Sequence, residues 1–233
     1  PVLAGRKTYL FAFLDDRSRA VMAARFGFHE DTVRLAVALR PALAARGVPG
    51  SIYVDNGSSF VDSWLLRACA SLGIKLVHST PGRPQGRGKI ERFFRSVREQ
   101  FLVELTEDRL ARIDGLAGLN RLFTAWVETV YHPAIHSETG AAPLRRWREG
   151  IPDPLPRPSP AQLHEAFLWS EYRTVTKTAT VSLHANLYQV DELLVGRKVE
   201  LVFDPFDLTE IEVRYGGRSF GAAVAFTIGR HSH

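Results

Sequence analysis

The chain has 233 residues, 45% of them hydrophobic, which is enough for one well-buried core and a second, smaller one. Its formal net charge of +5 comes mostly from arginine, which favours a nucleic-acid partner, although solvated arginines on a mildly basic protein remain open on charge alone. A single cysteine, Cys69, excludes an internal disulfide and predicts a buried thiol in a reducing compartment. The sequence has no apolar run near the roughly 20 residues that span a bilayer and no signal-peptide pattern, so we expect a soluble cytoplasmic protein without a membrane partner.

The first third of the sequence alternates predicted strands and helices. Two apolar runs around a tight turn at residues 15–18 predict a β-hairpin. The expected elements, in chain order, are strands 8–14 and 19–28, a helix from Asp31 to Arg46 ended by Gly47, strand 51–55, a helix capped by Ser58 or Ser59 and stopped by Gly73, and strand 74–78. This order predicts an α/β fold, a mixed sheet with helices on its faces.

A surface loop and two helices are expected next. Residues 79–88 (STPGRPQGRG) are rich in Gly and Pro and predict the loop. The following helix, residues 89–105, has a predicted buried stripe of Ile90, Phe94, Val97, Phe101 and Leu105. A further helix covers about residues 116–130, before His132-Pro133.

A proline-rich stretch predicts the domain boundary. Half of residues 151–160 (IPDPLPRPSP) are proline, which favours a stiff extended linker. Beyond it, short β-rich runs at 172–181, 186–190, 197–203, 209–215 and 219–226 predict a small all-β barrel. We therefore expect a core at 1–150, a linker at 151–172 and a barrel at 173–233.

Two acidic residues are the candidate catalytic and metal-binding groups. Asp55 ends a predicted buried strand, at the sheet edge where α/β folds place their sites, although Asp-Asn-Gly after a strand is most often turn chemistry. Glu91 lies in the first turns of the 89–105 helix, off the apolar stripe, where a solvated glutamate is the ordinary expectation. Each acid alone is weak evidence for a site.

The two acids and their surroundings resemble a known enzyme family. They are separated by 35 residues, and the segments YVDNGSSF and HSTPGRPQGRGKIERFFRSVR resemble those of DDE transposases and retroviral integrases. The resemblance implies a ribonuclease H-like core in which three carboxylates hold two Mg²⁺ (or Mn²⁺) ions, with Asp55 second and Glu91 third. Carboxylates are the ligands that Mg²⁺ prefers, and phosphodiester displacement needs two such ions about 4 Å apart.

Basic residues around Glu91 are the candidate DNA-binding groups. Between Arg83 and Arg98 there are six positive residues and one negative residue. Arg95 and Arg98 follow Glu91 at i+4 and i+7 on the same helix face. The resemblance gives them a DNA contact, and gives Gln85 a contact with the DNA end. The predicted DNA-binding set is Gln85, Arg87, Lys89, Arg95 and Arg98, with solvation as the alternative for the arginines.

The first acid of the family pattern has no clear counterpart. The resemblance places it on a strand before TYLFAFLDDRSR, so we expect it upstream of Pro1 and expect this chain to be inactive by itself. Asp15 and Asp16 would then be turn residues, with Asp16 able to pair with Arg17 or Arg19. The alternative is that Asp15 or Asp16 is the first metal ligand.

Two later segments extend the resemblance. WVETVYHPAIHSETGAAP resembles the end of bacterial integrase-type cores; there His132 and His136 could bind a metal, but Pro133 favours a packing role. NLYQVDELLVGRKVELVFDPFDLTEIEV resembles the barrel of Mu-type transposases. Its basic residues, Arg197, Lys198, Arg214 and Arg218, could contact DNA, contact another protomer, or be solvated.

The resemblance implies a Mg-dependent polynucleotidyl transferase that cleaves and joins DNA. The expected partners are transposon ends, target DNA and further copies of the chain assembled on DNA, in a bacterial cytoplasm near the nucleoid. Two alternatives stay open. One is a nuclease of the same fold without strand transfer, and the other is a noncatalytic DNA-binding assembly subunit.

Overall fold

The computed structural model describes residues 1–29, 32–54, 63–78 and 87–226. The chain divides into two compact units, Pro1–Leu163 and His164–His233. Each unit has its own hydrophobic core.

The predicted hairpin forms in the first unit. After a short pair, β1 (Val2–Leu3) and β2 (Arg6–Lys7), strand β3 (Tyr9–Leu14) runs antiparallel to β4 (Val21–Gly27). The turn between them is longer than predicted, because Arg19 takes a left-handed conformation with φ of 68° and β4 starts only at Val21. Asp15 is a turn residue, as expected: one carboxylate oxygen accepts from the Ser18 N–H at 2.7 Å and from its hydroxyl at 2.5 Å.

Helices and parallel strands alternate after the hairpin. Helix α1 (Thr32–Arg46) ends at Gly47, which takes φ of 81° and donates its N–H to the Leu43 carbonyl at 3.1 Å. Strand β5 (Ser51–Val54), helix α2 (Ser63–Ser71) and strand β6 (Lys75–His78) follow, and β5 pairs in parallel with β6. The expected caps Asp31, Ser58 and Ser59 lie outside the described residues. Cys69 is buried in α2, and burial raises the pKa of its thiol to about 11, which fits an inert structural cysteine.

The strands predicted to form one mixed sheet form two separate pairs among the described residues. The antiparallel pair β3–β4 and the parallel pair β5–β6 supply both kinds of strand pairing, but no described ladder joins them. The first unit is therefore mixed α/β, with helices packed on its strands.

The long helix that carries Glu91 changes pitch along its length. Helix α3 (Arg87–Ser96) continues into a π-helical turn (Val97–Phe101) and a 3₁₀ turn (Leu102–Glu104). Arg87 and Gly88, predicted as loop, are thus helical. The wholly buried residues are Phe93, Val97 and Phe101, whereas Ile90 and Phe94 are only partly buried, so the predicted stripe was displaced by one residue at its start.

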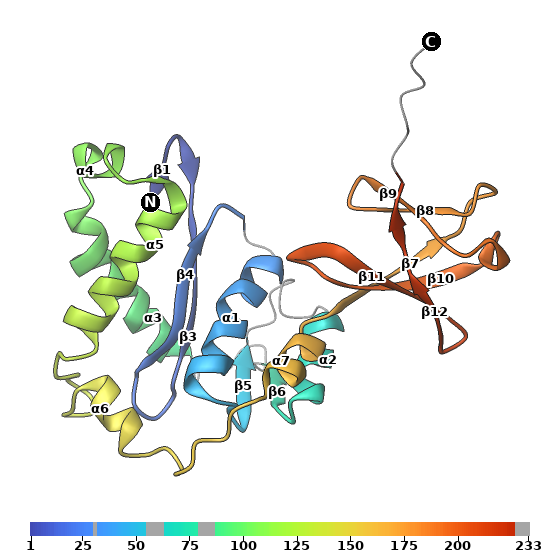
Figure 1. Cartoon of the computed structure of the whole chain (residues 1–233). Coiled ribbons are helices and arrows are strands. Elements are labelled where there is room, and N and C mark those ends of the chain that lie inside the picture. The colour runs from blue at the N-terminus through green and yellow to red at the C-terminus, as the bar shows by residue number, and fades with distance from the viewer. Residues whose placement is uncertain (30–31, 55–62, 79–86, 227–233) are drawn as a thin grey trace. The chain divides into compact units, whose positions relative to one another are not determined.

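The remaining helices of this unit enclose its core. They are α4 (Glu107–Ala111), α5 (Gly115–Trp126) with a π-helical turn (Val127–Tyr131), and α6 (Pro143–Arg148). Figure 1 shows α3 and α5 on one side of the β3–β4 hairpin and α1 on the other. Aromatic side chains fill the first interface: Phe123 lies 5.0 Å from both Phe26 and Phe101, measured between ring centroids.

The proline-rich stretch packs on the first unit. The Val48 N–H donates to the Pro156 carbonyl at 3.0 Å, just beyond the end of α1. Helix α7 (Pro160–Ala166) then begins inside the stretch predicted as linker, and the division between the units falls within α7.

The second unit is all-β. One sheet has the order β12-β11-β10-β7 and the other β13-β9-β8, around a single core. The strands are β7 (Trp169–Thr174), β8 (Thr180–Leu183), β9 (Asn186–Gln189), β10 (Lys198–Asp204), β11 (Asp207–Tyr215), β12 (Arg218–Ala222) and β13 (Val224–Ala225). The run predicted at 172–181 was wrong as one strand, because a turn at Thr176–Ala179 divides it.

Candidate functional site

The first turns of α3 present Glu91 to solvent. Its neighbour Phe93 is 1% exposed and fixes the orientation of the helix, so Glu91 points away from the core. The Glu91 side chain has no hydrogen bond or ion pair with another described residue. A free, exposed carboxylate is a suitable oxygen ligand for a hard cation such as Mg²⁺.

Asp55 and two of the DNA-binding candidates cannot be compared with this geometry. Asp55 and Gln85 lie outside the described residues, and only the backbone of Arg87 is described. Val54, directly before Asp55, pairs with His78 at the carboxyl ends of β5 and β6. Within the described part of the chain, no group of three His, Cys, Asp or Glu side chains could hold a metal ion.

Lys89 forms an ion pair with the hairpin turn. Its Nζ lies 2.6 Å from Asp16 Oδ1. The expected pairing of Asp16 with Arg17 or Arg19 was wrong, because the turn directs Asp16 toward α3 and Arg19 toward Glu138. Part of the positive charge of Lys89 is therefore compensated within the protein.

Glu138 joins the same turn to α3. Its Oε1 lies 2.8 Å from Arg19 Nη2, and its Oε2 lies 3.6 Å from Arg92 Nη1. The hydrogen bond from Arg19 holds the pKa of the Glu138 carboxyl below its usual range. Glu138 stays ionised at neutral pH between two guanidinium groups.

Arg95 and Arg98 remain available to an external partner. Both side chains are exposed, and neither has an ion pair with another described residue. Arg95 lies in the regular part of α3 and Arg98 in the π-helical turn. Their charge is uncompensated on the helix that carries Glu91, which suits contact with phosphate.

His132 has a packing role, as expected. Its Nε2 accepts from the Val21 N–H at 3.0 Å, and its Nδ1 lies 3.1 Å from Glu128 Oε2. Burial lowers the pKa of His132. His136 accepts from the Glu138 N–H at 3.3 Å, and burial together with Arg19 and Arg92 lowers its pKa too.

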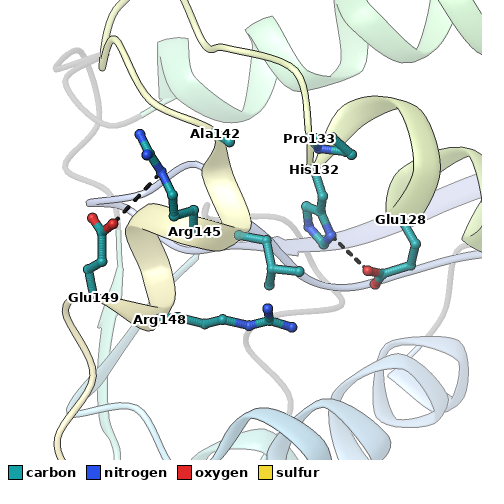
Figure 2. Close-up of a pocket in the computed structure, with 8 residues that line it drawn as sticks. Glu128, His132, Pro133, Ala142, Arg145, Arg148 and Glu149 are labelled. Carbon is teal, nitrogen blue, oxygen red and sulfur yellow. Dashed lines mark hydrogen bonds and ion pairs between the residues drawn. The ribbon is translucent and has the colours of Figure 1, made fainter.

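A shallow pocket of about 270 Å³ lies beside His132, between the π-helical turn and α6. Figure 2 shows the His132–Glu128 and Arg145–Glu149 pairs at its rim. None of the predicted site residues lines it. The pocket therefore adds nothing to the Glu91 site.

The basic residues of the second unit are largely engaged. Arg214 is bonded to Glu212. The Arg197 guanidinium lies 5.9 Å from the Tyr215 ring centroid, and Lys198 Nζ lies 5.6 Å from that of Tyr172. The geometry by itself favours neither DNA nor a second protomer as their partner.

Sequence reasoning missed Arg19 and Glu138 in the surroundings of Glu91. They are 119 residues apart in sequence, so no local spacing reports their contact. The one available signal in the sequence was that Glu138 is the only charged residue in HSETG and its uncharged surroundings, which suggests a specific partner for its carboxylate.

Comparisons with known proteins agree with the fold and the domain order. Residues 1–84 match the family "Integrase core domain", and residues 164–220 match "Mu transposase, C-terminal". The first match ends before Glu91, so the role of Glu91 stays a prediction.

A curated relative and a solved structure cover most of the chain. The transposase for transposon Tn552 of Staphylococcus aureus is 26% identical over 227 residues, which are 90% of this chain and 47% of that protein. The chain thus spans about half the length of this relative. A chain of the simian T-cell lymphotropic virus intasome, solved in complex with PP2A regulatory subunit B56 gamma, matches with a TM-score of 0.55 and 15% identity. The match covers 98% of this chain and 76% of that one, which shows a shared fold.

None of the described helices is long and apolar enough to cross a membrane. The fold, both family matches and the Tn552 relative agree with the sequence resemblance. The chain is therefore similar, in this order, to an integrase core domain over residues 1–84 and to a Mu transposase C-terminal domain over residues 164–220.

Proposed function

We propose that this chain is the catalytic part of a DNA transposase that cleaves DNA strands and joins them to a target. The observation that carries the proposal is Glu91: an exposed carboxylate without a described partner, on a basic helix, in a chain with an integrase core domain and a Mu transposase C-terminal domain. The Tn552 relative is itself a transposase.

Asp55 and Glu91 would hold the metal ions together with a third carboxylate. When bound, two Mg²⁺ or Mn²⁺ ions stabilise the charge on the attacking and leaving oxygens of a phosphodiester displacement. Glu91 fits as a ligand because its carboxylate oxygens are hard donors and are not engaged by another described residue.

The basic residues of α3 would hold the DNA backbone near these acids. Arg95 and Arg98 supply uncompensated charge, and Lys89 can exchange Asp16 for a phosphate oxygen. Gln85 and Arg87 precede them in the chain; Gln85 is proposed to contact the DNA end and Arg87 to bind DNA. Assembly of several copies on DNA, in the cytoplasm near the nucleoid, is part of the same proposal.

The test is a strand-transfer assay in the full-length protein with a pre-cut transposon end and a plasmid target. Glu91→Gln should lower the rate of joining by about 10²–10³-fold or more, because a charged ligand to the reacting centre is lost. Glu99→Gln is the matched control, since Glu99 is also exposed and lies further along the same helix. We expect it to retain activity.

Other outcomes separate the alternatives. Hydrolysed ends without joined products would indicate a nuclease of this fold. If calorimetry detects no Mn²⁺ or Mg²⁺ binding and no DNA product forms, a noncatalytic assembly subunit explains the chain better, and the proposal fails.

A further inference from the structure

One direct ionic contact and one that runs through Glu138 connect α3 with the turn between β3 and β4, one on each side of Glu91 in the sequence. Lys89 pairs with Asp16 at 2.6 Å. Arg92 pairs at 3.6 Å with Glu138, which in turn pairs at 2.8 Å with Arg19. Glu91 thus lies between the two anchored positions of its helix.

The turn that supplies Asp16 and Arg19 is itself fixed. Asp15 accepts two hydrogen bonds from Ser18, and the Tyr131 hydroxyl donates to the Arg19 carbonyl at 3.0 Å. Arg19 holds a left-handed backbone with φ of 68°, a strained conformation for a residue with a side chain. The turn is therefore a rigid support for α3.

Glu138 meets a buried cation. The Arg19 side chain is 7% exposed, and its buried Nε has no hydrogen-bond partner in the described structure. Glu138 is the acid with which this guanidinium pairs. Most exposed ion pairs contribute little, but one that neutralises a buried arginine contributes more, because removing the acid leaves the charge uncompensated.

We propose that Asp16 and Glu138 are positioning residues that hold the first turns of α3, and with them Glu91, in place before DNA binds. The consequence for catalysis rests on the proposed function of Glu91. A carboxylate that must meet a reacting phosphate within a fraction of an ångström gains from such support, since small displacements reduce rates strongly.

Amide hydrogen exchange tests whether these residues stabilise α3, and it does not depend on enzymatic activity. In Arg92→Gln, amides of α3 should exchange up to about fivefold faster than in the unmodified protein, as expected for the loss of one exposed ionic contact. Glu138→Gln should have at least this effect, because it also removes the partner of the buried Arg19. The double variant should match Glu138→Gln, because both changes break the same contact to α3. Asp16→Asn should also increase the exchange rate of amides in α3.

The matched control is Glu149→Gln. Glu149 is 60% exposed and pairs with Arg145 at 3.7 Å in α6, so the same chemical change is made outside the α3 contacts. Arg92→Gln also leaves the Arg19–Glu138 pair intact, which keeps the test valid if Glu138→Gln is poorly folded. If α3 exchanges in Arg92→Gln no faster than in Glu149→Gln, the proposal is overturned.

Strand-transfer kinetics add a second readout. Glu138→Gln removes a negative charge and so cannot weaken attraction to phosphate. We expect kcat to fall on the order of tenfold while KM for DNA does not rise. These kinetics are measured in the full-length protein. Unchanged kcat would overturn the positioning role, whereas a complete lack of strand transfer by the unmodified full-length protein would overturn the proposed function and leave the exchange result standing.

Discussion

Replacement of His132 tests how the hairpin is attached to the helices behind it. The imidazole accepts from the Val21 N–H at 3.0 Å and lies 3.1 Å from Glu128 on its other nitrogen. His132→Phe removes both bonds while keeping a flat ring. His132→Gln keeps an acceptor at the position of Nε2 and loses the bond to Glu128.

The expected magnitudes differ because the two partners differ in burial. Val21 is 4% exposed, and leaving its N–H without a partner costs about 1–3 kcal/mol. The Glu128 side chain is 42% exposed, so its bond contributes about 0.2–1 kcal/mol. We expect His132→Phe to lower the free energy of unfolding by about 1–4 kcal/mol and His132→Gln by about 1 kcal/mol or less.

The pH dependence has a defined sign. Burial lowers the pKa of His132 in the folded protein, so below about pH 6.5 the unfolded chain binds the proton more readily. The unmodified protein therefore loses stability as the pH falls through this range, and part of that loss disappears in both variants. His136, whose pKa is also lowered, remains in all three proteins and does not affect the comparison.

Urea unfolding at pH 8 and pH 5.5, followed by tryptophan fluorescence, measures both effects. Trp64, Trp126 and Trp147 lie in the same unit as His132, so the signal reports mainly on that unit. Equal destabilisation by Phe and Gln at pH 8 would refute the role of the Val21 bond. A gap between variants and unmodified protein that widens at pH 5.5 would refute the lowered pKa.

Other predictions concern packing, backbone and charge. Phe93→Ala, at a side chain that is 1% exposed, should cost about 3–5 kcal/mol in urea unfolding. Gly47→Ala should cost more than Gly73→Ala: both have positive φ, but a Cβ on Gly47 would lie 2.7 Å from the Pro156 carbonyl oxygen, whereas Gly73 has open space. Equal costs for the two would argue against this packing of the proline stretch. Arg98→Gln should reduce by about one the slope of log affinity for DNA against log salt concentration, measured by fluorescence anisotropy. An unchanged slope would mean that Arg98 contacts no phosphate.

The sequence predicted the longer helices and most strands because their patterns are local, whereas the short helices α4, α6 and α7 were not predicted. Gly47 and Gly73 marked helix ends, and both take positive φ in the structure. The buried stripe of α3 was less predictable, because Phe93 and Phe94 are adjacent and a π-helical turn follows them. When adjacent positions of a helix are both apolar, the sequence does not indicate which of the two faces the core.

Helical periodicity predicted that Glu91 is exposed, but it could not predict the ion pairs of Lys89 and Arg92 on either side of it. Asp16 lies 73 residues before Lys89, and their pairing depends on how the hairpin packs against α3. The turn chemistry of Asp15 was predictable because Ser18 is only three residues away. Contacts between segments that are distant in sequence can be identified only once the fold is known. Asp16 and Glu138, which we propose to hold Glu91 in place, make contacts of this kind.

Charge is divided unequally between the two units. Residues 1–163 contain 23 Lys or Arg and 16 Asp or Glu, whereas residues 164–233 contain seven and nine. Long-range attraction to a polyanion should therefore come from the first unit, since it scales with net charge. Because the second unit has more acidic than basic residues, substitution of its Lys198 by Gln should leave the salt dependence of DNA binding unchanged where Arg98→Gln reduces it. A reduced slope for Lys198→Gln would instead place that strand on the DNA backbone.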